Sequence, residues 1–68
     1  MKHFIKISTV DGRKHIERYV KPENIVEMFV EGGKLYLLTY IPNVGSRTYQ
    51  ITDTPEEINE RIEGEKGF

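Results

Sequence analysis

Residues 25–41 read IVEMFVEGGKLYLLTYI, and this stretch decides the fold. Two runs rich in β-branched and aromatic residues flank Gly32-Gly33, which predicts a β-hairpin with strands over 25–30 and 35–41. One face of that hairpin is aliphatic. The other face carries Ile25, Phe29, Tyr36, Leu38 and Tyr40, with Glu27 as its only charge. A sheet with one solvated face alternates apolar and polar residues, so this pattern predicts that both faces are covered.

A second hairpin is predicted before this stretch. Residues 4–10 favour a strand, and Asp11-Gly12 is a strong signal for a two-residue turn. With that turn, Val10 is expected to face Arg13, and three further cross-strand pairs join like or complementary side chains. They are Ile7–Ile16, Lys6–Glu17 and Phe4–Tyr19. Residues 21–24, which include Pro22, then interrupt the sheet because proline donates no ladder hydrogen bond.

The last third of the chain predicts a fifth strand and one helix. Residues 47–51 alternate as a strand, and Thr54 with Glu57 forms a capping-box pattern before a short apolar stripe. The expected helix covers 55–63 and ends at Gly64, which leaves 64–68 as a frayed tail. The predicted fold is therefore mainly β, a five-stranded antiparallel meander or small half-open barrel with one C-terminal helix. Residues 1–63 form the single domain.

Length and composition limit the chain to one modest core. A domain of 68 residues buries about 60% of its unfolded surface, and without cysteine it has no disulfide to support it. Self-association is the expected extra support. No run approaches the roughly 20 apolar residues of a membrane span, so no membrane partner and a cytoplasmic location are expected.

Charge is unevenly distributed although the formal net charge is only −1. Residues 1–21 hold six bases and two acids, whereas residues from 47 onward hold six acids and three bases. This asymmetry is compatible with head-to-tail contacts or an acidic partner, or with two solvated faces that have no partner.

The residues give no indication of catalysis, a cofactor or a metal. The two histidines, His3 and His15, fall on opposite faces of the predicted hairpin, so they cannot share a metal ion. In the expected register His15 opposes Ser8, but no acid stands where it would orient that pair. The acids of residues 53–60 fit the first turn of a helix. We therefore expect a protein that is not an enzyme.

Single-stranded nucleic acid is the alternative partner. Small β-barrels bind it with basic and aromatic side chains that share a groove. The chain offers six such residues: Arg13, Lys14, Arg18, Tyr19, Arg47 and Tyr49. A pI near 6.1 argues against this reading, because such domains are usually clearly basic.

Three segments carry a resemblance to a known family. They are I-K-x-x-x-x-D-G-R at residues 5–13, P-E-N-I-V at 22–26 and T-P-E-E-I at 54–58. In these the chain is similar to small bacterial and phage β-proteins of the FlbD-type flagellar-operon family. The resemblance implies a short-stranded sheet closed by a helix, and it implies no catalytic residues.

The sequence as a whole predicts a non-enzymatic interaction or structural protein. Its expected partner is a further copy of itself or another protein, bound through Phe29, Tyr36, Leu38 and Tyr40. The competing reading makes these four residues core, with the helix on one side of the hairpin and the first hairpin on the other.

Overall fold

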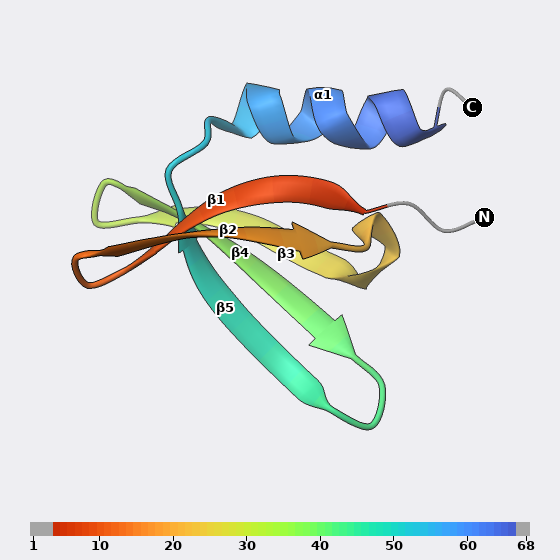
Figure 1. Ribbon diagram of the computed structural model, residues 1–68, viewed down its shortest axis with the longest axis horizontal. Helices are drawn as coiled ribbons and strands as arrows, with labels where there is room; N and C mark the ends of the chain where they lie inside the picture. The colour runs from red at the N-terminus through yellow and green to blue at the C-terminus, as the bar shows by residue number, and fades with distance from the viewer. Residues whose placement is uncertain (1–3, 67–68) are drawn as a thin grey trace.

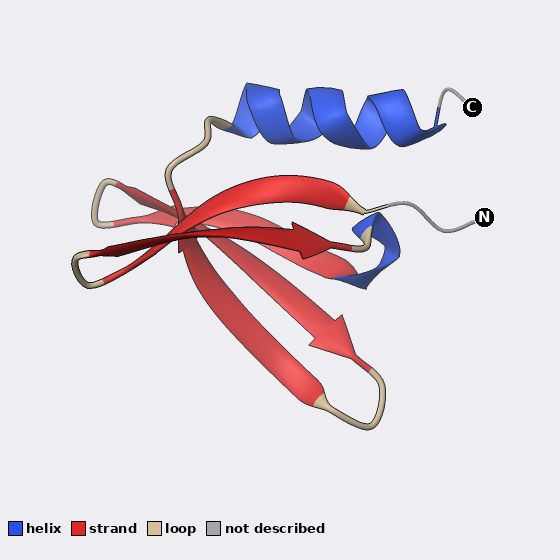
Figure 2. Ribbon diagram, viewed as in Figure 1, coloured by secondary structure: helices blue, strands red, loops and turns tan. Residues whose placement is uncertain are grey.

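The computed structural model describes residues 4–66, which form five strands, a short 3₁₀ turn and one helix (Figures 1 and 2). In chain order the elements are β1 (Ile5–Asp11), β2 (Lys14–Val20), η1 (Pro22–Asn24), β3 (Ile25–Glu31), β4 (Lys34–Ile41), β5 (Gly45–Ile51) and α1 (Pro55–Lys66). All strand pairs are antiparallel, in the order β2-β1-β5-β4-β3. The predicted fold class is confirmed.

The sheet curls because β1 joins β5, while β2 and β3 remain its two edges. The contact between β1 and β5 is short, since only Thr9 and Val10 pair with Ile51 and Gln50. Beyond these pairs the β4–β5 hairpin splays away from β1 (Figure 1). The result is a meander curled into a half-open barrel.

The register of the first hairpin differs from the expected one by two residues. Asp11 pairs with Lys14, and the turn residues are Gly12 and Arg13. Only Gly12 has a positive φ, 65°, which is the pattern of a type II′ turn. A type I′ turn on Asp11-Gly12 would force Asp11 into the left-handed region at a cost of about 1–2 kcal/mol.

This correction changes every partner that was expected for β1. Val10 lies opposite His15, Ile7 opposite Arg18 and Lys6 opposite Tyr19; Ser8, expected opposite His15, lies opposite Glu17. Because the shift is an even number of residues, each side chain keeps its face of the sheet. Lys6 and Glu17 still form an ion pair of 3.7 Å, now diagonally across the strands. Phe4 lies outside the paired segment.

The second hairpin has the expected register at its turn. Glu31 pairs with Lys34, and Gly32 and Gly33 have φ values of 59° and 76°, as a type I′ turn requires. A bulge between Ile25 and Glu27 then shifts the register. Ile25 therefore packs against the core and not on the aromatic side, where it was expected, whereas Val26 is exposed.

The core lies on the inner face of the curled sheet. Its buried members come from β1, β4, β5 and α1: Ile5, Ile7, Leu37, Ile51 and Ile58. Because Ile58 belongs to this cluster, α1 covers the same face that the first hairpin covers by curling. The reading that placed the helix and the first hairpin on opposite faces of the second hairpin is wrong.

The capping box at the start of α1 is present as expected. The Thr54 hydroxyl accepts a hydrogen bond of 3.1 Å from the Glu57 amide, and the Glu57 carboxylate accepts one of 2.9 Å from the Thr54 amide. The helix continues to Lys66, so its predicted end at residue 63 is wrong. Gly64 does not adopt the positive φ of a C-terminal cap. The rest of the expected tail, residues 67–68, lies outside the described residues.

Asp53 and Arg61 fasten α1 to the open side of β1. Asp53 accepts a hydrogen bond of 2.8 Å from the Ser8 amide and pairs with Arg61 at 3.2 Å. The Arg61 guanidinium also donates a hydrogen bond of 2.7 Å to the Lys6 carbonyl. The Ser8 amide and the Lys6 carbonyl lie in the part of β1 that does not pair with β5. Asp53 and Arg61 thus supply the hydrogen bonds that a neighbouring strand would otherwise make.

Candidate functional site

Four apolar side chains share the outer face of β3 and β4, and we call this set the aromatic face. It consists of Phe29, Tyr36, Leu38 and Tyr40. Phe29 and Tyr36 are cross-strand partners whose rings stack, with centroids 5.4 Å apart and planes inclined by 23°. Tyr40 is 51% exposed, and the other three are half-buried. The set that was predicted from the sequence is therefore brought together.

Local sequence explains why these residues meet. The Gly32-Gly33 turn fixes the register that places Phe29 opposite Tyr36. Alternation along β4 then adds Leu38 and Tyr40 to the same side. Such an aromatic pair contributes about 0.5–1.5 kcal/mol beyond its buried area.

The aromatic face continues onto an uncharged part of β5. Tyr36 lies opposite Gln50, Leu38 opposite Thr48 and Tyr40 opposite Ser46. No charged side chain interrupts these six positions. Since α1 and the first hairpin both cover the inner face, no described element covers this side.

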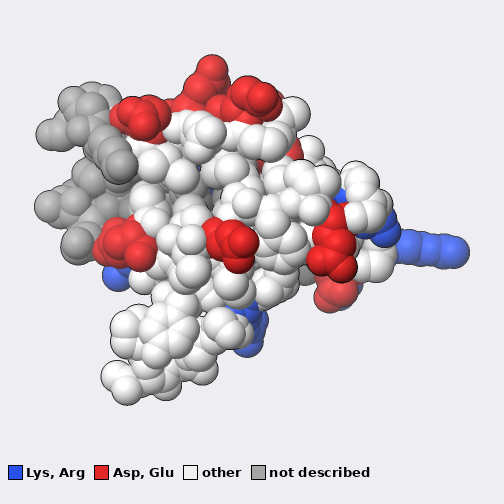
Figure 3. All heavy atoms as spheres, turned by 180° about the vertical axis from the view of Figure 1, so that it is seen from behind, with Lys and Arg blue, Asp and Glu red and all other residues white. Residues whose placement is uncertain are grey.

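The turn between β4 and β5 extends the uncharged surface. Ile41 and Val44 are exposed there, and Asn43 has a φ of 69°, which asparagine tolerates in turns. In Figure 3 the end of this hairpin projects from the molecule without a charged side chain. The aromatic face thus ends in an exposed apolar tip.

The six candidate nucleic-acid contacts are divided between two sides of the sheet. Arg18, Arg47 and Tyr49 line a polar hollow of about 300 Å³ beside Thr9 and Gln50. Tyr19 lies opposite Lys6 on the outer side, 62% exposed. The two bases at the tip of the first hairpin are separate again: Arg13 lies in the turn, and Lys14 pairs with Asp11.

Arg18 covers the ring that a base would need. Its guanidinium carbon lies 4.8 Å from the centroid of the Tyr49 ring, within cation–π range. The Arg18 Nε is buried and has no hydrogen-bond partner among the described residues. A base could stack on this face of the Tyr49 ring only after Arg18 moved.

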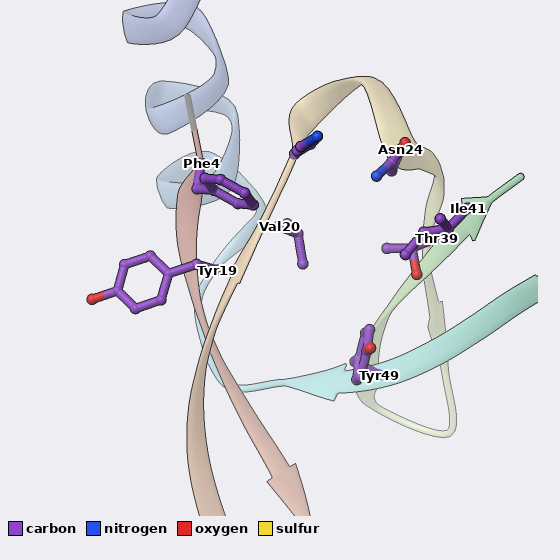
Figure 4. A pocket seen from close by; sticks show the side chains of 8 residues that line it. Phe4, Tyr19, Val20, Asn24, Thr39, Ile41 and Tyr49 are labelled. Carbon is purple, nitrogen blue, oxygen red and sulfur yellow. The ribbon is translucent and has the colours of Figure 1, made fainter. Parts of the chain in front are cut away.

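A second hollow, of about 260 Å³, lies at the mouth of the half-open barrel (Figure 4). Phe4, Val20, Ile41 and Tyr49 give it apolar walls, and Asn24 of η1 stands at its rim. In Figure 4 the Tyr19 ring points away from it. The sequence analysis missed this hollow, since it exists only because β2 and β3 do not pair, and a local pattern does not report that.

Other kinds of site find little support in residues 4–66. This part of the chain contains no group of three histidine, cysteine or acidic residues that could hold a metal ion. His3 lies outside the described residues, and His15 is exposed opposite Val10. Within the same range no helix is long and apolar enough to cross a membrane.

Comparisons with known proteins give no match from which a function could be inferred. The chain matches no protein-family model, and it matches neither a curated protein nor a solved structure. The resemblance to the FlbD-type family therefore stays a prediction from the sequence, and the surface of β3 and β4 has to be interpreted from its own residues.

Proposed function

We propose that the chain is a small non-enzymatic interaction protein that self-associates through the aromatic face. The observation that carries this proposal is the position of the two covers. Both α1 and the first hairpin pack on the inner face, so the stacked Phe29 and Tyr36 and their neighbours have no cover of their own. Contiguous exposed apolar patches on small proteins mark interaction sites.

The composition of this surface favours a second copy as the partner. Tyrosine is enriched and charge is depleted at the centre of protein interfaces. From Tyr36 to Tyr40 the outer side of β4 and the facing part of β5 have that composition. The charged residues of this face are Glu31 and Lys34 at the turn and Glu27, which lies opposite Leu38. Two such sheet faces can stack at about 10 Å with their side chains interdigitated.

The test is the mass of the protein in solution, measured by size-exclusion chromatography with light scattering over a range of concentrations. We expect the wild-type mass to exceed that of one 8.0 kDa chain. Tyr40→Glu should lower it, because it places a charge in the interface at a residue that is half exposed in the free chain.

Phe4→Glu is the matched control. Phe4 is 55% exposed but lies before β1 and is not one of the four residues of the aromatic face. A wild-type protein that stays monomeric at the highest concentration contradicts the proposal. So does a Tyr40→Glu protein that keeps the full wild-type mass.

Binding of single-stranded nucleic acid is the second candidate function, and the gathering of Arg18, Arg47 and Tyr49 around one hollow favours it. We expect a labelled oligonucleotide to bind with an affinity that falls steeply with salt. Arg47→Ala should weaken binding, because it removes one base from this hollow. It should leave the fold intact, because Arg47 is exposed. No binding at low salt excludes this function.

A further inference from the structure

The half-open barrel has two free strand edges. β2 and β3 stand at opposite ends of the strand order, and no described residue pairs with the outer side of either. In the chain they are separated only by η1 and its flanking residue, yet they form no ladder with each other. Unpaired edges expose rows of N–H and C=O groups, which are templates for a further strand.

The register shows which residues offer these backbone groups. In an antiparallel pair, hydrogen-bonded and non-hydrogen-bonded pairs alternate, beginning with a hydrogen-bonded pair at a two-residue turn. On β3 this alternation directs the N–H groups of Met28 and Val30 outward, away from β4. On β2 it directs those of His15, Glu17 and Tyr19 outward, away from β1.

The edge of β3 carries only part of the protection that exposed edges usually have. Natural edges are blunted by charged side chains, especially lysine, and by proline, bulges or short length. β3 has seven residues with neither lysine nor proline, and Val26 and Val30 are 61% and 67% exposed. The bulge at Val26 disturbs only the start of the strand.

The two edges carry opposite charge. β2 holds two bases, Lys14 at its start and Arg18, whose guanidinium lies over the Tyr49 ring, against a single acid, Glu17. β3 holds Glu27 and Glu31 and no base, and neither of them forms an ion pair among the residues that the structure describes. Pairing β3 with β3 would bring four glutamates together, whereas pairing β3 with β2 brings acids to bases.

We infer that β3 of one copy adds to β2 of a second copy and so extends the sheet from chain to chain. The inference rests on the proposed self-association and adds to the aromatic face a second, head-to-tail contact between copies. Because the contact joins two different edges, each of two paired copies still has one free edge. Further copies can add there, so the contact forms a ring or a chain of copies. Seven residues on each strand match in length.

Two proline variants test the two edges separately. Val30→Pro removes an outward N–H from β3, and Glu17→Pro removes one from β2, while the ladders to β4 and β1 keep their hydrogen bonds. Val30→Thr and Glu17→Thr are the controls that retain the N–H. All four are made in the Tyr40→Glu background, where the aromatic face no longer contributes, and circular dichroism verifies their folding.

The decisive experiment mixes the two proline variants. Each alone should be a monomer by light scattering, because each lacks one of the two edges. The mixture should form a species of two chains, since one variant supplies an intact β2 and the other an intact β3. Each threonine variant should form assemblies of more than two chains, and added salt should weaken this assembly.

Other outcomes overturn the inference. If the proline mixture stays monomeric while the threonine variants assemble, the edges do not pair in this way. If Glu17→Pro alone forms a two-chain species, β3 pairs with β3. A wild-type assembly that depends on Tyr40 and is unaffected by Val30→Pro leaves the proposed function standing and removes this inference alone.

Charge reversal gives a second test if a proline variant fails to fold. The paired change Glu27→Lys with Glu31→Lys reverses the charge of β3, and Lys14→Glu reverses that of β2; all three residues are exposed. Each reversal should weaken assembly at least tenfold in the Tyr40→Glu background. The chain that carries all three changes should recover the assembly, because β3 then holds two bases and β2 a net negative charge. No recovery overturns the inference.

Discussion

Replacing Ile58 by alanine should remove much of the stability of this domain. Ile58 is fully buried and joins α1 to Ile5, Ile7, Leu37 and Ile51 in the core. The change deletes three carbons, worth about 2.4 kcal/mol at roughly 0.8 kcal/mol each. The residual cavity adds to this, so we expect a loss of about 3–4 kcal/mol, within the range observed for such substitutions.

That loss is large for a chain of this size. At roughly 0.05–0.15 kcal/mol per residue, the domain has about 3–10 kcal/mol of stability in total. A helix of this length is marginal in water on its own, so weakening its contact with the core should melt it. The helical signal in circular dichroism should therefore decrease together with the tertiary signal.

Urea unfolding, followed both by circular dichroism and by tyrosine fluorescence, measures the effect. With a slope near 1 kcal/mol per molar urea, the midpoint should fall by about 3 M. Ile58→Val, which deletes one carbon, should cost only about 1 kcal/mol. Ile62→Ala should cost less than Ile58→Ala, because Ile62 is only half-buried. A loss below 1 kcal/mol for Ile58→Ala would refute the docking of α1 into the inner face.

Three further substitutions test local features, each by the same unfolding measurement. Thr54→Ala removes the capping hydrogen bond to Glu57 and should cost about 1 kcal/mol; an unchanged stability would contradict the cap. Gly33→Ala forces a methyl group onto a φ of 76° and should cost at least about 1 kcal/mol, and a neutral effect would show that the turn relaxes. Asp53→Ala leaves the Ser8 amide unpaired and should cost about 1–3 kcal/mol, more than Asp53→Asn, which keeps an acceptor; equal losses would assign the effect to charge alone.

Local patterns in the sequence predicted those parts of the fold that depend on neighbouring residues. The Gly32-Gly33 turn needs two positive φ angles, and only glycine accepts them without strain, so the register of β3 and β4 followed. In the first hairpin a single glycine allows two placements of the turn, and the structure adopts the less strained one, Gly12-Arg13, and not the predicted Asp11-Gly12. The faces were nevertheless correct, because both placements preserve the alternation of inward and outward side chains.

The features that were missed depend on contacts between distant segments. The short β1–β5 ladder and the contacts of Asp53 and Arg61 with β1 join residues 40 or more positions apart, and no periodicity in the sequence reports them. The face that α1 covers was equally undetermined. Ile58 and Ile62 give the helix one apolar stripe, and either apolar face of the second hairpin would accept it.

The position of α1 connects the fold to both proposals. One narrow apolar stripe can cover only one face of a sheet, and Ile58 assigns that stripe to the inner face. The first hairpin reaches the same face, since Ile5 and Ile7 complete the same cluster. The only described helix and the first hairpin thus both pack on one side of the sheet, while the aromatic residues of β3 and β4 lie on the other side. The same curl that brings the first hairpin to the core also separates β2 from β3 and leaves two edges of opposite charge. The aromatic face and the free edges are therefore two consequences of a single arrangement, and both proposals assign them the same partner, a second copy of the chain.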